Sequence, residues 1–167
     1  MTRREAREPA RAFIGLGANL GDAAGALQAA LAALRDLPQT TLVCHSSMYR
    51  SAPVDASGPD YLNAAAEVRT HLAPLDLLTH LQALELRHGR ERPYRNAPRT
   101  LDLDLLLFGE LTLSTPTLTL PHPRLHERAF VLLPLAEIAP HLRLPCGAGV
   151  AELLASVAAQ RIERLNP

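Results

Sequence analysis

The segment that most constrains the fold runs from Arg99 to Gly109 and reads Arg-Thr-Leu-Asp-Leu-Asp-Leu-Leu-Leu-Phe-Gly. Its alternation has the period of a strand, so Asp102 and Asp104 should project from one face and the leucines beside them from the other. Their Cα atoms would lie about 6–7 Å apart, close enough for the carboxylates to converge on one or two cations. Spacing alone also fits an edge strand with a polar face in water. The apolar run Leu105–Phe108 instead favours a strand buried in the core.

Four arginines precede this strand in one predicted loop, namely Arg90, Arg92, Arg95 and Arg99. The chain contains no lysine, so phosphate groups must be bound by arginine side chains or by the backbone. Neighbouring carboxylates repel each other unless a cation compensates them, and magnesium is usually held by one or two carboxylates together with substrate phosphates. Acidic and basic groups at one strand end therefore predict a phosphoryl-transfer site.

Length and composition predict one domain, because 167 residues with 47% hydrophobic content can bury a core. We expect a disordered tail over residues 1–11 and a single domain over residues 12–167. A net charge of zero gives no reason to expect binding to nucleic acid or to an acidic membrane. The charged first residues do not resemble a signal peptide and no apolar run is long enough to span a bilayer, so we expect a cytoplasmic protein.

Strand-like and helical segments are mixed without regular alternation, which predicts an α+β fold: a ferredoxin-like sandwich with a mainly antiparallel central sheet. Asp22 should cap a helix that ends before Pro38, and Pro74 should open one that Gly89 ends. The extended segments are residues 13–17, 40–50 and 61–70, and further helices are expected over residues 126–138 and 149–157. The loop over residues 51–60, rich in turn formers, is a candidate for function.

Three other kinds of functional motif are not supported by the sequence. The glycines at 15, 17 and 21 do not have the spacing of a dinucleotide-binding loop, so we interpret residues 15–22 as a strand end and a tight turn. His122 and His126 are four residues apart, but Pro123 argues against one continuous helix, and two ligands are too few for a zinc site. No local motif of nucleophilic catalysis is present.

Several motifs occur together and in order. They are Gly-Leu-Gly-Ala-Asn-Leu-Gly-Asp at 15–22, Tyr49-Arg50-Ser51 with Pro53, Asp60-Tyr61-Leu62-Asn63-Ala64-Ala65, Gly89-Arg90-x-Arg92, Pro98-Arg99-Thr100-Leu101-Asp102-Leu103-Asp104, and Leu120-Pro121-His122-Pro123 followed by Arg128-Ala129-Phe130. This ordered set, from Phe13 to about Pro140, closely resembles the hydroxymethyl-dihydropterin pyrophosphokinase family of folate biosynthesis.

The resemblance implies transfer of the terminal pyrophosphate of ATP to the hydroxymethyl group of a reduced pterin, with release of AMP. It implies two magnesium ions on Asp102 and Asp104, with catalytic roles for these aspartates and for Arg90 and Arg99. The implied ATP contacts are Arg90, Arg92, Arg99, His122, Gln82, Glu85, Leu105 and Thr119. The implied pterin contacts are Ser51, Pro53, Val54, Tyr61, Asn63, Arg128 and Phe130, with the ring stacked between Tyr61 and Phe130. ATP and the pterin are the expected partners of a monomer.

Two alternatives from other classes remain. A magnesium-dependent nucleotidyltransferase would use the same pair of aspartates but would release pyrophosphate instead of AMP. A ferredoxin-like regulatory domain would bind a small ligand without turnover, although it would need neither the paired acids nor the arginine loop beside them.

Overall fold

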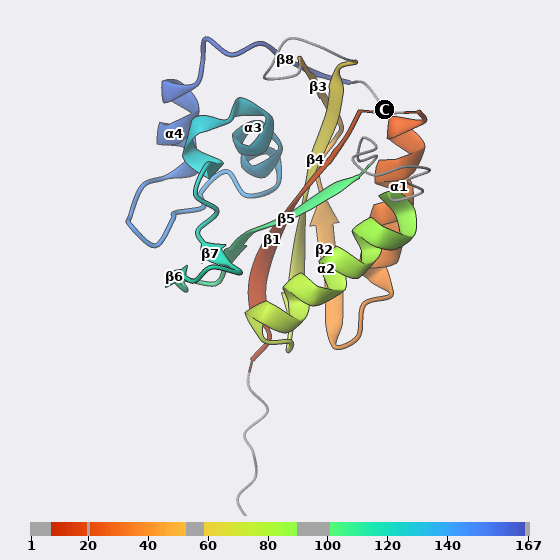
Figure 1. Cartoon of the computed structure of the whole chain (residues 1–167). Coiled ribbons are helices and arrows are strands. Elements are labelled where there is room, and N and C mark those ends of the chain that lie inside the picture. The colour runs from red at the N-terminus through yellow and green to blue at the C-terminus, as the bar shows by residue number, and fades with distance from the viewer. Residues whose placement is uncertain (1–7, 20, 53–58, 90–100, 166–167) are drawn as a thin grey trace, which may run out of the picture.

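The computed structural model describes residues 8–19, 21–52, 59–89 and 101–165 (Figure 1). Six strands form one antiparallel sheet in the order β5-β1-β4-β3-β8, with β2 also paired to β4. The strands are β1 (Ala10–Ala18), β2 (Thr40–His45), β3 (Tyr49–Ser51), β4 (Tyr61–Thr70), β5 (Asp102–Phe108) and β8 (Ile162–Arg164). A short hairpin of β6 (Leu113–Ser114) and β7 (Thr119–Leu120) follows β5.

Helices α1 (Ala23–Arg35) and α2 (Pro74–Gly89) cover one face of the sheet (Figure 1). The side chain of Asp22 accepts a hydrogen bond from Gly25 N at 3.0 Å, which caps α1 as predicted. Leucines at helical spacing on both helices pack against β1, β4 and β5; they are Leu27, Leu31, Leu34, Leu77, Leu81 and Leu84. The order β1-α1-β2/β3-β4-α2-β5, with β1 between β5 and β4, confirms the ferredoxin-like prediction.

Helices α3 (Ala129–Ile138) and α4 (Val150–Ser156) lie on the opposite face (Figure 1). A second core forms there around Phe13, Leu106, Leu107, Leu132 and Leu135. A bulge opposite Phe13 and Ile14 lets Leu106 and Leu107 both join this core. The helix predicted from residue 126 begins three residues later, because residues 125–127 form the 3-10 turn η1 (Leu125–Glu127). Among the described residues, no helix is both long and apolar enough to cross a membrane.

Two segment boundaries differ from the sequence-based expectations. Strand β1 begins at Ala10, so residues 10 and 11, which were expected in the tail, belong to the sheet; residues 1–7 lie outside the described part of the chain. Arg11 belongs to the strand because its Nη2 pairs with the buried carboxylate of Glu67 at 2.8 Å. The predicted extended segment 40–50 is divided into β2 and β3, because the Ser46 hydroxyl accepts the Ala65 N–H at 2.9 Å between them.

Strand β5 was expected inside the sheet, but it lies at the sheet's edge and pairs with β1. It is nevertheless buried, since neighbouring elements cover its outer side. Glu85 of α2 accepts a hydrogen bond from Leu103 N at 3.1 Å, and Leu106 O accepts one from His122 N at 2.9 Å. The outer edge of β5, the edge that does not pair with β1, is therefore hydrogen-bonded to other elements.

Candidate active site

The two aspartates of β5 lie beside the two glycines of β1. Asp102 is opposite Gly17 and Asp104 is opposite Gly15 in the antiparallel register. All four residues belong to the face that α3 and α4 cover only partly, and they line one cavity. Because the glycines have no side chains, the β1 backbone forms the base of this cavity beside the carboxylates. We call Gly15–Gly17 the glycine floor.

Sequence reasoning missed this floor. It placed Gly15 and Gly17 correctly at the end of a strand and Gly21 in a turn, where Gly21 has a φ of 59°, but it gave the two strand glycines no role in a site. A Cβ at Gly15 would lie 3.3 Å from Leu106 Cδ2, and one at Gly17 would lie 3.4 Å from Asn63 Oδ1. Two glycines separated by a single residue inside a strand are the signal that could have indicated a close approach of backbone and ligand.

The cavity has a volume of about 360 Å³. It brings together Ser51, Tyr61, Asn63, Asp102, Asp104, Arg128 and Phe130, all of which the sequence singled out. It also contains residues that sequence reasoning did not identify, namely Gly15, Leu16, Gly17, Asn19, Ala52, Ala64, Ala65, Leu106 and Val131. Residues from β1, β3, β4, β5 and α3 thus converge on one cavity.

The β3–β4 wall of the cavity is polar. Asn63 is 4% exposed and its Nδ2 donates a hydrogen bond to Ser51 Oγ at 2.8 Å. Tyr61 lies opposite Ser51 in the register of the two strands. A buried amide held by a neighbouring hydroxyl is suited to reading a fixed edge of donors and acceptors on a ligand.

The facing wall comes from the beginning of α3. The guanidinium carbon of Arg128 lies 5.3 Å from the centre of the Phe130 ring, within the range of a cation–π contact. Arg128 occupies the N-cap position of the helix and its side chain makes no capping hydrogen bond. Both residues line the cavity, where the ring of Phe130 offers a flat apolar surface.

His122 lies near both acidic and basic groups of the site. Burial lowers the pKa of His122; the charge of Asp104 opposes this shift, while Arg128 and Arg124 add to it. Its Nδ1 faces Arg124 N at 3.2 Å and accepts that hydrogen bond. The neutral ring then carries its proton on Nε2, where it can act as a hydrogen-bond donor.

Four further predicted ATP contacts are described by the structure but do not line the cavity. Gln82 is exposed on α2, and Glu85 is bonded to the β5 backbone. Leu105 is 3% exposed in the core, and Thr119 is half-buried in β7. Five predicted contacts lie outside the described residues: Pro53, Val54, Arg90, Arg92 and Arg99.

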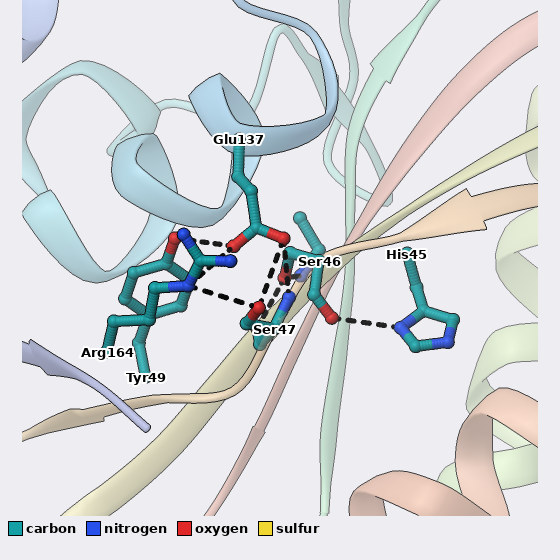
Figure 2. A network of polar contacts seen from close by, with 7 residues as sticks. His45, Ser46, Ser47, Tyr49, Glu137 and Arg164 are labelled. Atoms are coloured by element: carbon teal, nitrogen blue, oxygen red, sulfur yellow. Dashed lines mark hydrogen bonds and ion pairs between the residues drawn. The ribbon is translucent and has the colours of Figure 1, made fainter. Parts of the chain in front are cut away.

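Glu137 of α3 joins this helix to the sheet (Figure 2). Its carboxylate accepts hydrogen bonds from Tyr49 OH at 2.7 Å and from Ser47 N at 2.8 Å, and it lies 3.6 Å from Arg164 Nε. Burial would raise the pKa of Glu137, but these hydrogen bonds and the Arg164 charge hold it below its ordinary value. Burial and the hydrogen bond to Glu137 raise the pKa of Tyr49 to about 12.

We expect Glu137→Gln to lower the free energy of unfolding at pH 7 by about 1–3 kcal/mol, because a charged acceptor is lost. A depressed carboxyl pKa stabilises the fold above the ordinary value of 4.5 and stops doing so as the pH falls through the lower folded value. Urea unfolding of both proteins should therefore show their difference narrowing in acid. A difference that stays constant down to pH 3 would contradict this account of the network.

The donor set of the cavity can be compared with the needs of a metal ion. Asp102 and Asp104 are hard oxygen ligands on one strand face, and no cluster of three or more His, Cys, Asp or Glu residues suited to a metal occurs in the described ranges. Two carboxylates fit magnesium, which keeps its remaining positions for water and substrate phosphates. The residues present thus fit an ion that is bound jointly with a phosphorylated substrate.

A ferredoxin-like domain whose cavity combines paired carboxylates, an amide and an aromatic ring has the groups expected of a small-molecule phosphotransferase. The chain belongs to the 7,8-dihydro-6-hydroxymethylpterin-pyrophosphokinase (HPPK) family, whose model matches residues 13–140.

The chain is similar to two bacterial proteins named 2-amino-4-hydroxy-6-hydroxymethyldihydropteridine pyrophosphokinase. It is 51% identical over 156 residues to that of Pseudomonas aeruginosa, covering 93% of this chain and 96% of the relative. It is 45% identical over 157 residues to that of Haemophilus influenzae, covering 93% and 98%.

Solved structures with the same fold include an HPPK-DHPS in complex with substrates, with a TM-score of 0.73 and 12% identity over 89% of this chain and 43% of that one. Another is wild-type HPPK-DHPS of Plasmodium falciparum, with a TM-score of 0.70 and 12% identity over 93% of this chain and 42% of that one. The chain thus spans less than half the length of these proteins, and at this identity the likeness shows the fold.

Proposed function

We propose that this chain transfers the terminal pyrophosphoryl group of ATP to 6-hydroxymethyl-7,8-dihydropterin in folate biosynthesis, giving the pterin diphosphate and AMP. The observation that carries the proposal is the cavity itself, where Asp102 and Asp104 lie beside the glycine floor, between Asn63 and Phe130. The family match over residues 13–140 supports the same reaction.

The pterin would lie flat between Tyr61 and Phe130, where an aromatic stack contributes about 0.5–1.5 kcal/mol beyond area burial. Asn63 would read the polar edge of the ring, together with Ser51 and the backbone at Pro53 and Val54. This orientation directs the hydroxymethyl group toward the two aspartates.

ATP would be held by Arg90, Arg92, Arg99, His122, Gln82, Glu85, Leu105 and Thr119. Two magnesium ions held by Asp102 and Asp104 would neutralise the charge of the triphosphate when bound. The hydroxymethyl oxygen attacks the β-phosphorus, and the bond from that phosphorus to the oxygen bridging the α and β phosphates breaks. AMP leaves, and the hydroxyl proton passes to Asp104, which is exposed and can release it to water. The residues mainly position the reactants and balance charge.

We propose that the working unit is the monomer. We place the reaction in the cytoplasm, where ATP is available as co-substrate.

Incubation with ATP, magnesium and 6-hydroxymethyl-7,8-dihydropterin tests the proposal, with AMP and the pterin diphosphate as expected products. Release of pyrophosphate would indicate nucleotidyl transfer. Pterin binding without any product would indicate a regulatory domain.

The arginines should act on the phosphates and not on the pterin ring. We expect Arg90→Ala and Arg99→Ala to lower kcat by about tenfold or more while the pterin Kd changes by less than about threefold. Arg143→Ala is a matched control, because Arg143 is exposed and bonds to Gly147 O outside the cavity. Weaker pterin binding with an unchanged kcat would contradict the assignment of Arg90 and Arg99 to the phosphates.

A further inference from the structure

The side chain of Gln160 bridges the peptide groups on both sides of Arg128. Its Oε1 accepts a hydrogen bond from Ala129 N at 2.9 Å, and its Nε2 donates one to Glu127 O at 2.7 Å. Gln160 is itself exposed and does not line the cavity, whereas Arg128 and Phe130 do. It also lies beyond residues 13–140, the part of the chain that the family model matches.

The beginning of α3 explains what this bridge does. The N-cap position of a helix usually holds Ser, Thr, Asp or Asn, whose side chain bonds to a backbone N–H of the first turn. Here the N-cap is Arg128, which makes no such bond, and Gln160 bonds to one of these N–H groups from a distant part of the chain. The N-cap residue can therefore be an arginine that contacts Phe130 in the cavity.

Gln160 is held in place on both sides. Before it, Val157 is 6% exposed in the second core, and Gln160 N donates to Val157 O at 3.0 Å in a turn. After it, β8 pairs with β3, placing Ile162 opposite Ser51. The segment from α4 to β8 passes over the α3 side of the sheet and ends beside β3 (Figure 1). It thus connects both walls of the cavity.

We propose that Gln160 is a positioning residue for pterin binding, which fixes the backbone of Arg128 and so sets the positions of Arg128 and Phe130 over the glycine floor. This inference rests on the proposed function, because it takes the pterin to occupy this cavity. Gln160 acts through α3 and does not touch the substrate.

The test measures two affinities for each variant by calorimetry: that of 6-hydroxymethyl-7,8-dihydropterin with magnesium and a non-hydrolysable ATP analogue present, and that of the analogue alone. Gln160→Ala removes both hydrogen bonds and should raise the pterin Kd about 5- to 30-fold while the analogue Kd stays within about twofold. Gln160→Glu keeps an acceptor for Ala129 N and should have a smaller effect. Because Gln160 is exposed, neither substitution leaves a core cavity.

Ser156→Ala is the matched control, since it removes a hydrogen bond to Leu153 O at 2.6 Å in the same segment but does not reach α3. It should leave both affinities unchanged. The inference is overturned if the pterin Kd of Gln160→Ala matches the wild type, or if both ligands weaken by the same factor. If Gln160→Ala does not fold, Gln160→Glu is judged by the same criteria. A wild-type protein that binds no pterin would instead refute the proposed function.

Discussion

Replacing Asp102 or Asp104 with alanine is expected to lower kcat by about 10³-fold or more while leaving the fold intact. Each carboxylate would hold a cation that neutralises developing charge on the phosphates, an effect of several kcal/mol, and each tenfold in rate corresponds to about 1.36 kcal/mol. Asp104 is exposed and Asp102 is half-buried, so neither substitution opens a cavity in the core. Removing one of two neighbouring like charges also relieves repulsion.

AMP release over time measures this effect, and thermal unfolding checks the fold. Asp36→Ala is a suitable control, because Asp36 is an exposed aspartate at the end of α1 on the other side of the sheet. If both cavity variants release AMP at nearly the wild-type rate, the carboxylates do not form the metal site.

Asn63→Leu should raise the pterin Kd by about 10- to 100-fold while the affinity for an ATP analogue stays unchanged. The side chain is buried at the cavity wall, and replacing it with an apolar group would leave polar atoms of the ligand unpaired at about 1–3 kcal/mol each. Leucine has a similar size, so the lost hydrogen bonding dominates over a change of volume.

Ser51→Ala tests how much the hydrogen bond between Ser51 and the Asn63 amide contributes to pterin affinity. It removes the acceptor of the 2.8 Å hydrogen bond from Asn63 but keeps the amide, so its effect should be smaller than that of Asn63→Leu. Equal pterin affinity in Asn63→Leu and wild type, measured by calorimetry, would remove Asn63 from the pterin site.

Local signals predicted the elements well. Asp22 and Pro74 were placed correctly at the starts of their helices, and the alternation around Asp102 gave the correct face of the strand. These features depend on interactions between near neighbours in sequence, namely caps and strand periodicity. The ferredoxin-like arrangement followed from the order of the elements, and the structure confirms it.

Features set by distant contacts could not be predicted. Periodicity reports whether side chains are buried, and β5 is buried although it is an edge strand, because Glu85 and His122 bond to its outer side. The break after His45 depends on a hydrogen bond from Ala65 to Ser46, and the sequence there contains neither glycine nor proline. Gln160 gives no local signal, because its partners lie about thirty residues earlier. The roles assigned to Arg90, Arg92 and Arg99 remain predictions.

The glycine floor has a consequence for inhibitors and for resistance to them. A compound that lies on residues 15–17 contacts main-chain atoms, which point mutations cannot remove. A Cβ added at Gly17 would lie 3.4 Å from Asn63 Oδ1, and one added at Gly15 would lie 3.3 Å from Leu106 Cδ2, so a substitution there would crowd side chains that line the cavity. A compound that depends on the side chain of Tyr61 or Arg128 would lose that contact through a single substitution, but under the proposed function the same substitution would also alter the pterin site.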